Sequence, residues 1–274
     1  MGAQRWISLG PLNIQPSELM KIALILALAR YLSRFKTEEI QKKPRLLIPA
    51  VIMILLPMAP VLKQPDLGTA VLLGMIGVCL LFVAGVKLRY FLSFGFLGIL
   101  TLPFGWYCLR PYQQNRILTF LDPERDPLGS GYHILQSKIA LGSGGFFGKG
   151  FMAGSQSHLN FLPEKQTDFI FTMFSEEFGF FGALCLLCLY LFIMIQGFRI
   201  SLSARGLFEK FVALGIVVTL FIYVFINMSM VMGLVPVVGI PLPLISYGGT
   251  ALLTLLISFG LLLGVDLQRY RGYA

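Results

Sequence analysis

The chain has 274 residues, of which 56% are hydrophobic and 13% are charged. Soluble globular domains carry roughly 25% charged residues, so a water-exposed globular surface is excluded and lipid must cover much of the protein. The net charge is +9, but no basic run is interleaved with aromatic side chains, as nucleic-acid binding would favour. We expect no nucleic-acid partner, because basic cytoplasmic loops of a membrane protein explain the excess charge.

Seven apolar segments are long enough, or nearly so, to cross a bilayer core of ~30 Å as helices. The first, residues 17–32, is short and carries Glu18 and Lys21. The sequence therefore predicts an all-α fold, a single polytopic membrane domain over residues 1–274 with about seven transmembrane helices. The other six segments are residues 45–62, 68–85, 88–109, 170–197, 207–231 and 242–265.

The distribution of lysine and arginine predicts the orientation of these spans, because cytoplasmic loops are enriched in both residues. Seven spans place all the basic connections on one side, which we expect to be the cytoplasm. The segments 63–67, 110–168 and 232–241 then face outward. The basic connections are residues 33–45, 86–90 and 198–210 and the C-terminal tail.

The predicted outer loop of residues 110–168 is far more polar than the spans. Loops of this length are usually functional or disordered, and its many Phe, Leu, Ile and Tyr residues argue against disorder. Its cations, which include Arg116, Lys138 and Lys149, favour an anionic ligand at the outer leaflet. Long loops also escape the bias against outer basic residues, so charge alone leaves both interpretations open.

Three charged residues lie within or beside the first predicted spans, where charge is costly and usually marks function. Glu18 and Lys21 are three residues apart, on one helix face, where they can pair. Asp66 lies at an outer helix start. The structural alternatives are an ion pair for Glu18 and Lys21 and a simple helix cap for Asp66.

A glycine-rich segment, residues 143–150 (Ser-Gly-Gly-Phe-Phe-Gly-Lys-Gly), superficially resembles a phosphate-binding loop. It is not a Walker motif, because Ser143 stands where the first glycine is required and Gly150 replaces the Ser or Thr after the lysine. The glycines with Lys149 could still present main-chain N–H groups to a phosphate. A flexible or re-entrant turn is the alternative.

The strongest candidate for chemistry lies where the long loop meets the next apolar run, in residues 167–171. Thr167 is typical of a helix start, so we expect Asp168 at the entry to the membrane. A carboxylate there is partly desolvated and therefore more basic than in water, which suits a general base. Glu164 would share its face on a helical turn, and the two carboxylates could hold a divalent cation. A helix cap is the alternative for Asp168.

Several motifs occur in one order along the chain, and together they are far more specific than any one of them. They include Gln15-Pro16-Ser17-Glu18, Gln64-Pro65-Asp66-Leu67-Gly68, Gly131-Tyr132-His133-Ile134, Gln136-Ser137-Lys138, Thr167-Asp168-Phe169-Ile170-Phe171 and Pro241-Leu242-Pro243-Leu244-Ile245-Ser246-Tyr247-Gly248-Gly249. On these residues the chain resembles the SEDS family (shape, elongation, division and sporulation proteins), and within it the RodA-like proteins. The resemblance runs from Gly2 to about Gly264.

This resemblance implies a multi-pass protein of the bacterial cytoplasmic membrane with an active site that faces outward. It implies a peptidoglycan glycosyltransferase that polymerises lipid II for cell-wall elongation and rod shape. Asp168 would be the general base that deprotonates the acceptor 4-hydroxyl, with inversion at the anomeric carbon and loss of undecaprenyl diphosphate. A divalent cation, Mg²⁺ or Mn²⁺, is expected and no organic cofactor. The implied partners are lipid II, the growing glycan strand, a class B penicillin-binding protein and the elongation machinery.

The resemblance also assigns the remaining site residues. Four match family polar positions that face a central cavity and are expected to bind substrate: Glu18, Lys21, Asp66 and Gln136. Three cations are candidates to stabilise the diphosphate leaving group: Arg116, Lys138 and Lys149. The resemblance assigns no metal ligands, and the two carboxylates that could hold the cation are those of Asp168 and Glu164.

Two departures from the family pattern qualify these expectations. RodA-like proteins have about ten spans, so we expect three helices to be missing before Gly2, in a fragment, a chain with a mis-assigned start or a reduced gene. Gln166 stands where a histidine is common, which leaves an imidazole beside the base unsupported.

Two rival functions stay open, a lipid II flippase or transporter and a non-catalytic scaffold for the penicillin-binding protein. A flippase needs charges along a path across both leaflets, whereas the charges here gather outward, which favours the polymerase.

Overall fold

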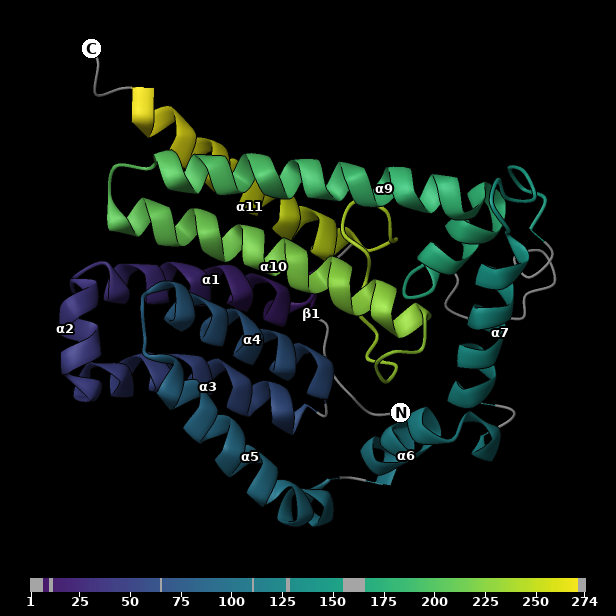
Figure 1. Cartoon of the computed structure of the whole chain (residues 1–274), viewed down its shortest axis with the longest axis horizontal. Coiled ribbons are helices and arrows are strands. Elements are labelled where there is room, and N and C mark those ends of the chain that lie inside the picture. The colour runs from purple at the N-terminus through teal and green to yellow at the C-terminus, as the bar shows by residue number, and fades with distance from the viewer. Residues whose placement is uncertain are drawn as a thin grey trace. The chain divides into compact units, whose positions relative to one another are not determined.

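The computed structural model describes residues 7–9, 12–64, 66–109, 111–126, 129–154 and 166–270, which are mostly helical (Figure 1). Among these residues the only strands are β1 (Ile7–Leu9) and β2 (Leu12–Ile14), a short antiparallel pair before the first helix. The predicted all-α fold is therefore confirmed.

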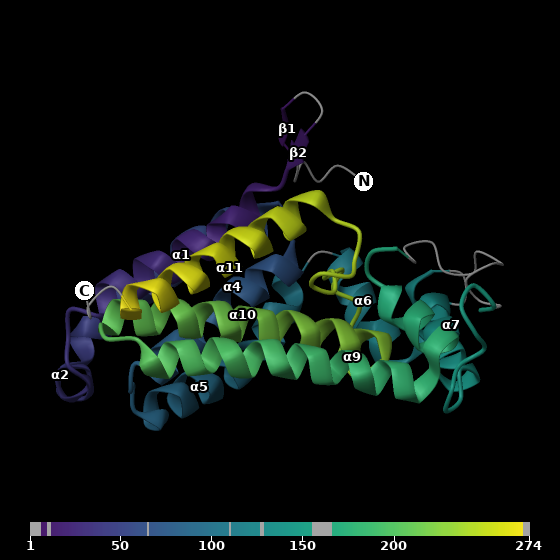
Figure 2. The same ribbon diagram turned by 90° about the horizontal axis from the view of Figure 1, so that it is seen from above.

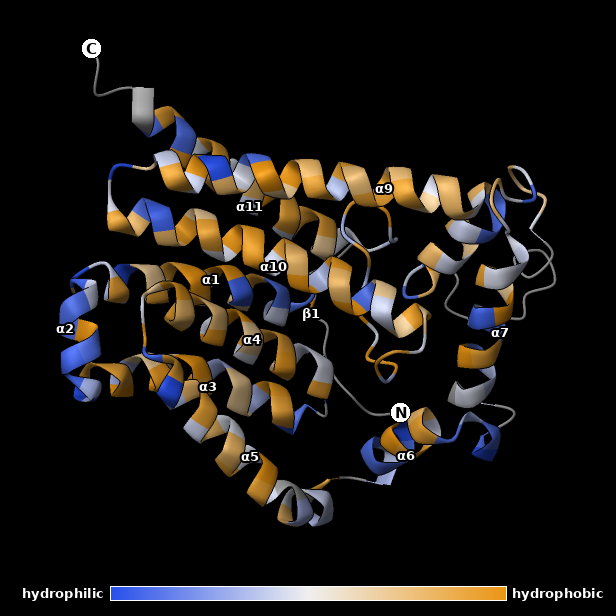
Figure 3. Ribbon diagram, viewed as in Figure 1, coloured by the Kyte–Doolittle hydropathy of each residue, from blue (hydrophilic) through white to orange (hydrophobic). Residues whose placement is uncertain are grey.

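The apolar helices follow the predicted spans closely. Within the described residues, four segments are long and apolar enough to cross a membrane, and two more are shorter apolar helices. Figure 3 shows the contrast between the hydrophobic α9 (Ile170–Ser203) and the hydrophilic α2 (Thr37–Lys42). The remaining helices at the predicted spans are α1 (Pro16–Leu32), α3 (Leu47–Lys63), α4 (Leu67–Val83), α5 (Leu88–Cys108), α10 (Leu207–Val231) and α11 (Gly249–Tyr270).

The start of the last predicted span, residue 242, is wrong, because α11 begins only at Gly249. Pro241 and Pro243 each lack the main-chain N–H that a helix needs in its interior. Leu244 has a φ of 67°, which a right-handed helix cannot contain. This apolar stretch is therefore an irregular segment and not part of the helix.

The predicted outer loop contains regular structure of its own. It holds the helices α6 (Pro111–Leu121) and α7 (Ser130–Ser143), with a 3₁₀ turn, η2 (Pro123–Arg125), between them. A second 3₁₀ turn, η1 (Pro44–Leu46), leads into α3.

The chain divides into two compact units, which we describe separately. The first comprises residues 1–88, 192–222 and 248–274, and the second comprises residues 89–191 and 223–247.

In the first unit α1, α3 and α4 pack against one another, and α1 also packs against α11 (Figure 2). Small residues allow these helices to approach closely, as in other membrane bundles. A Cβ atom on Gly77 would lie 2.5 Å from the Ile54 side chain, and one on Gly215 would lie 2.6 Å from Ile25. The packed interior is mostly apolar, and its buried polar residues include several at the starts of α1, α4 and α11.

Candidate active site

Glu18 and Lys21 form a buried ion pair in the first turns of α1. The Lys21 Nζ lies 2.6 Å from the Glu18 Oε1, and the two residues are 2% and 8% exposed. Pro16 at the helix start is compatible with the first turn, where no intrahelical N–H bond is lost. The predicted pairing of these residues is confirmed. Burial of both charges is expensive, so their retention needs either a structural or a functional reason.

Asp66 is the N-cap of α4, as the structural alternative predicted. Its carboxylate accepts hydrogen bonds from the Thr69 main-chain N–H at 3.1 Å and from the Thr69 hydroxyl at 2.9 Å. The same carboxylate is close enough to Lys21 to interact with it electrostatically. Asp66 therefore caps a helix and also contributes to the field around the ion pair.

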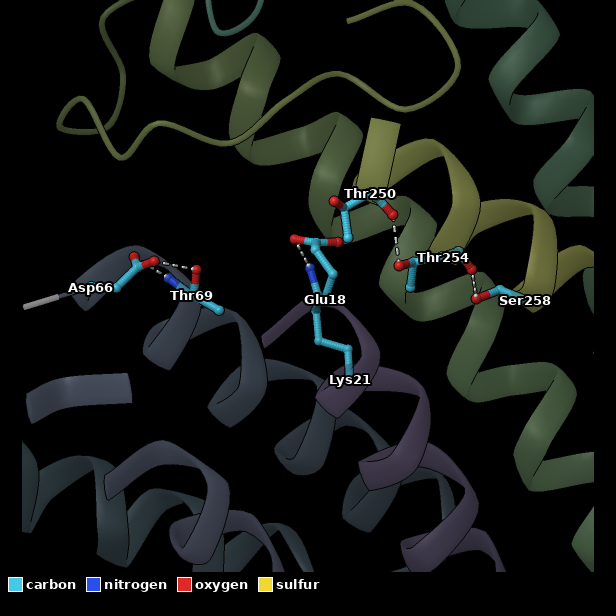
Figure 4. A network of polar contacts seen from close by, with 7 residues as sticks. All are labelled: Glu18, Lys21, Asp66, Thr69, Thr250, Thr254 and Ser258. Carbon is cyan, nitrogen blue, oxygen red and sulfur yellow. Dashed lines mark hydrogen bonds and ion pairs between the residues drawn. The ribbon is translucent and has the colours of Figure 1, made fainter. Parts of the chain in front are cut away.

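The polar surroundings of Glu18 extend onto α11. Figure 4 shows the Glu18 carboxylate pointing toward Thr250, in a helix that packs against α1. Thr254 and Ser258 follow at intervals of four residues, and each hydroxyl donates to the carbonyl one turn earlier. We call Glu18, Lys21, Asp66, Thr69 and Thr250 the Glu18 cluster.

In the second unit, Asp168 lies immediately before α9, which starts at Ile170. Asp168 therefore stands at the entry to a membrane helix, as the sequence predicted. Three consecutive main-chain carbonyls lead up to that helix, those of Gln166, Thr167 and Asp168. Each accepts a hydrogen bond from a donor elsewhere in the unit.

The three donors come from the end of α10 and from the segment after it. The Tyr247 N–H donates to the Gln166 carbonyl at 2.9 Å, and the Ser246 hydroxyl donates to the Thr167 carbonyl at 2.6 Å. The Asn227 Nδ2 donates to the Asp168 carbonyl at 3.0 Å and to the Ile240 carbonyl at 2.6 Å. Residues 232–247, which we call the 232–247 loop, thus hold the backbone that carries Asp168 together with Asn227 of α10.

Gly239 in the 232–247 loop lies directly against the Asp168 carboxylate. Its φ is 76°, a conformation that favours glycine, and a Cβ atom there would lie 3.2 Å from the Asp168 Oδ2. The missing side chain leaves room beside the carboxylate oxygen.

α7 is attached to the same region. The Ser137 hydroxyl lies 2.9 Å from the Thr172 hydroxyl of α9 and donates to the Val231 carbonyl at 2.9 Å. Lys138 follows, with its exposed side chain against Gly233, where a Cβ atom would lie 2.8 Å from the Lys138 Nζ. Gln136 precedes Ser137 on the same helix and is half-buried. α7 therefore brings two of the predicted substrate-binding residues into the unit that contains Asp168.

Arg116 is exposed on α6, with its guanidinium carbon 5.9 Å from the centre of the Tyr112 ring. Its predicted role with the leaving group stays a prediction. Glu164 lies outside the described residues, so its predicted metal-binding role stays a prediction as well.

The glycine-rich segment is joined to a break in α9. Gly179 has a φ of 67° and a ψ of −166° inside that helix. Such a break frees the carbonyls of Glu176 and Glu177 and the N–H groups of Phe180 and Phe181 from their i to i+4 bonds. In a membrane, freed groups of this kind must find other partners within the protein.

The glycine-rich segment supplies all four partners. Lys149 and Gly150 donate their N–H groups to the carbonyls of Glu176 and Glu177, each at 3.0 Å. The Gly145 and Phe146 carbonyls accept from the Phe180 and Phe181 N–H groups at 2.9 and 3.0 Å. The segment is thus a turn that completes a broken membrane helix. The N–H groups of Lys149 and Gly150 are used in that role and do not form a free phosphate cradle.

Lys149 reinforces this junction with its side chain. Its Nζ lies 2.7 Å from the Oε1 of Glu176, whose side chain is completely buried while that of Lys149 is 29% exposed. Lys149 therefore neutralises a buried charge in α9. Its predicted role with the leaving group stays a prediction.

His133 of α7 packs its ring against Phe169, the residue after Asp168, with 6.3 Å between the ring centres. Its Nδ1 is buried and has no hydrogen-bond partner among the residues that the structure describes. Burial lowers the pKa of the imidazole, and the nearby Asp126 carboxylate offsets part of that effect. The neutral form of His133 is therefore favoured relative to that of a solvent-exposed histidine.

A preformed metal cage of protein ligands is not seen in the described part of the chain, where no three His, Cys, Asp or Glu side chains gather at one point. Mg²⁺ is often bound by one or two carboxylates together with substrate phosphates and water. The single carboxylate of Asp168 is compatible with that mode of binding.

The sequence interpretation missed Asn227, Gly239 and Thr250. A signal for Asn227 is present, because it is a polar residue in the apolar run of α10, where polar groups usually mark function. Ser246 belonged to a recognised motif, but its contact with Thr167 was not expected.

Comparison with known proteins agrees with the predicted resemblance. The model of the FtsW/RodA/SpoVE family, described as cell cycle proteins, matches residues 1–271. The peptidoglycan glycosyltransferase MrdB of Escherichia coli K12 is 45% identical over 269 residues, which cover 98% of this chain and 72% of MrdB. The stage V sporulation protein E of Bacillus subtilis is 42% identical over 274 residues, which cover 99% of this chain and 73% of that protein.

Solved structures show the same fold. A chain from a structure on how a peptidoglycan synthase complex coordinates polymerization and crosslinking is 33% identical and superposes with a TM-score of 0.83, covering 98% of this chain and 75% of that one. The rod shape determining protein RodA of Thermus thermophilus is 30% identical and superposes with a TM-score of 0.67, covering 98% and 71% of the two chains.

Proposed function

Because the chain belongs to the FtsW/RodA/SpoVE family of cell cycle proteins, we propose that it is a peptidoglycan glycosyltransferase that polymerises lipid II into glycan strands. The observation that carries this proposal is the placement of Asp168. Its carboxylate stands at the entry to a membrane helix, on a backbone segment held by three hydrogen bonds. That is where the reactive end of a lipid-linked sugar must lie, since its lipid stays in the bilayer.

In the proposed reaction Asp168 is the general base. Its carboxylate accepts the proton of the acceptor 4-hydroxyl while that oxygen forms a bond to the anomeric carbon of the growing strand. The bond from that carbon to the diphosphate oxygen breaks, and undecaprenyl diphosphate leaves with the electron pair. The attack occurs from the opposite face, so the configuration at the anomeric carbon inverts. The proton on Asp168 then passes to water.

Stabilisation of the diphosphate is the second requirement, because negative charge develops on the leaving oxygen. We propose that Lys138 of α7 contributes, since its ammonium is exposed and α7 is tied to α9 and to the end of α10 through Ser137. Arg116 and Lys149 remain weaker candidates, the second because it pairs with Glu176. Asp168 would hold a divalent cation, Mg²⁺ or Mn²⁺, which would supply further positive charge to stabilise the leaving group.

For the Glu18 cluster we propose a role in binding the lipid-linked substrate, and for Gln136 of the second unit we propose a separate contact with it. The buried ion pair of Glu18 and Lys21 provides a donor and an acceptor within the mostly apolar interior of the first unit. A sugar or peptide amide in that surrounding requires such groups, since unpaired polar groups in an apolar medium are costly.

The proposed setting is the bacterial cytoplasmic membrane, with Asp168 on the outer side, where the positive-inside rule places the loop of residues 110–168. A class B penicillin-binding protein of the elongation machinery is the proposed protein partner. Its support is the similarity to a chain from a peptidoglycan synthase complex.

A reconstitution experiment separates this function from its rivals. The chain is placed in liposomes that contain lipid II, with Mg²⁺ or Mn²⁺ and with or without the penicillin-binding protein, and glycan products are separated on a gel. Glycan strands are expected. Movement of lipid II between leaflets without any polymer would instead indicate a transporter, and neither activity in the presence of the partner would indicate a scaffold.

A further inference from the structure

We propose that Asn227 is a positioning residue for Asp168, and that it sets the place of the carboxylate by joining two main-chain segments. This inference rests on the proposed function, in which Asp168 is the base. The two hydrogen bonds that the Asn227 amide donates go to main-chain carbonyls and not to the carboxylate. It acts through the Asp168 carbonyl and through the loop residue beside the carboxylate.

The two bonds of Asn227 use both N–H groups of its amide. One goes to the Asp168 carbonyl at 3.0 Å and the other to the Ile240 carbonyl at 2.6 Å. The side chain is completely buried, so water does not compete for these donors. An amide is the shortest side chain that carries two donors on one atom, and an aspartate of the same shape offers only acceptors.

The Asp168 carbonyl is held by a donor from outside its own helix. Gln166, Thr167 and Asp168 precede α9, which begins at Ile170, and the carbonyls of all three accept from residues elsewhere in the unit. Tyr247 and Ser246 satisfy the first two, and Asn227 satisfies the third. Of the three bonds, the one from Asn227 is on the residue that carries the reacting carboxylate.

The second bond, to the Ile240 carbonyl, holds the part of the 232–247 loop that lies beside the Asp168 carboxylate. Ile240 follows Gly239, whose Cα faces the Asp168 carboxylate so closely that a Cβ atom would be 3.2 Å from Oδ2. Because one amide binds both Asp168 and Ile240, it sets the separation between the carboxylate and the loop. A general base must lie within about 3 Å of the proton that it takes, so this separation controls reactivity.

A purely structural role for Asn227 predicts a different pattern of effects. Loss of a buried hydrogen bond would lower the melting temperature and the amount of folded protein, while the molecules that fold would work normally. A positioning role predicts that folded molecules react slowly although they bind substrate well. The ratio of kcat to KM effects therefore distinguishes the two.

The experiment measures kcat, KM for lipid II and Tm for the full chain and its variants Asn227→Asp, Asn227→Ala and Gly239→Ala. Asn227→Asp keeps the shape and removes both donors, and Gly239→Ala pushes on Oδ2 without touching Asn227. We expect kcat to fall by about 10-fold to 100-fold, as for small misplacements of reacting groups, with KM changed less than about twofold. Thr219→Val is the matched control, because Thr219 of α10 donates to the Gly215 carbonyl within its own helix, and its kcat should match that of the unaltered chain.

A folded Asn227 variant with unaltered kcat would overturn the inference. If neither Asn227 variant folds, Gly239→Ala decides, since an unchanged kcat there would show that the separation is not critical. Asp168→Asn is measured in parallel to keep the two proposals apart. An inactive Asp168→Asn with a fully active Asn227→Asp rejects the positioning role alone, whereas an active Asp168→Asn rejects the base itself.

Discussion

Lys149 and Glu176 are 27 residues apart in sequence, yet the Lys149 Nζ lies 2.7 Å from the Glu176 Oε1. The carboxylate is completely buried in α9, beside the Gly179 break in that helix. The lysine belongs to the segment that supplies the missing main-chain bonds. The pair therefore stabilises the attachment of the glycine-rich segment to α9, the helix that follows Asp168.

Removing Lys149 should destabilise the protein. Lys149→Ala leaves the Glu176 charge buried without its cation, which costs about 3 kcal/mol, the lower end of the usual range because Lys149 is partly exposed. The double variant Lys149→Ala with Glu176→Gln should recover much of the loss, because no buried charge remains. Thermal unfolding in detergent measures both, and Lys63→Ala at an exposed site of α3 is the control. Equal melting temperatures for Lys149→Ala and the control would show that the ion pair of Lys149 and Glu176 does not stabilise the protein.

Gly148→Ala should weaken the same junction through the backbone. Gly148 has a φ of 79°, and a Cβ atom there would lie 2.1 Å from the Glu177 carbonyl oxygen, so the segment must move away from α9. Gly142→Ala in α7 is the matched control, because nothing lies within 4 Å of its Cβ position and alanine favours a helix by about 1 kcal/mol. The expected melting temperatures fall for the first variant and stay or rise for the second. A higher melting temperature for Gly148→Ala than for Gly142→Ala would contradict the proposed junction between the glycine-rich segment and α9.

The Glu18 and Lys21 pair can be tested for a role beyond stability. Lys21→Met alone should lower the free energy of unfolding by about 3 kcal/mol, because the Glu18 carboxylate stays buried without the lysine that neutralises it. Lys21→Met with Glu18→Gln removes both charges and should recover most of the stability, since apolar or neutral replacements of buried pairs are often tolerated. If the pair binds substrate, the double variant stays folded but its KM for lipid II rises. An unchanged KM would leave only the structural role.

The fold could be predicted from sequence because hydropathy and helix-breaking residues act locally. The runs behind α3, α4 and α10 gave spans within two residues of their true ends. The break at Gly179 could not be predicted, because α9 is apolar on both sides of it and its new partners lie about thirty residues earlier. Asn227 was missed for a similar reason: it binds carbonyls 59 and 13 residues away along the chain. The place of Asp168 was predictable because a polar motif meets an apolar run there.

His133 predicts a specific pH dependence of stability. Burial lowers the pKa of its imidazole below the ordinary value of 6.5, so the unfolded chain binds this proton more readily than the folded protein. The contribution of His133 to the free energy of unfolding is therefore constant well above pH 6.5 and falls as the pH drops below that value. His133→Gln should lose less melting temperature than the unaltered chain between pH 7.5 and pH 5.5. Parallel curves for the two proteins would show that the imidazole is equally basic in both states.

The most direct test of the central claim is the initial rate of glycan formation by Asp168→Asn. The chain and this variant are compared at equal concentration and equal folded fraction, with lipid II and saturating divalent cation. The substitution keeps the size of the side chain and removes its ability to accept a proton. General-base catalysis contributes roughly 10²-fold to 10⁴-fold, so we predict a rate at least about 100-fold lower with a similar melting temperature. A folded variant that forms glycan strands at the rate of the unaltered chain would contradict the assignment of Asp168 as the base.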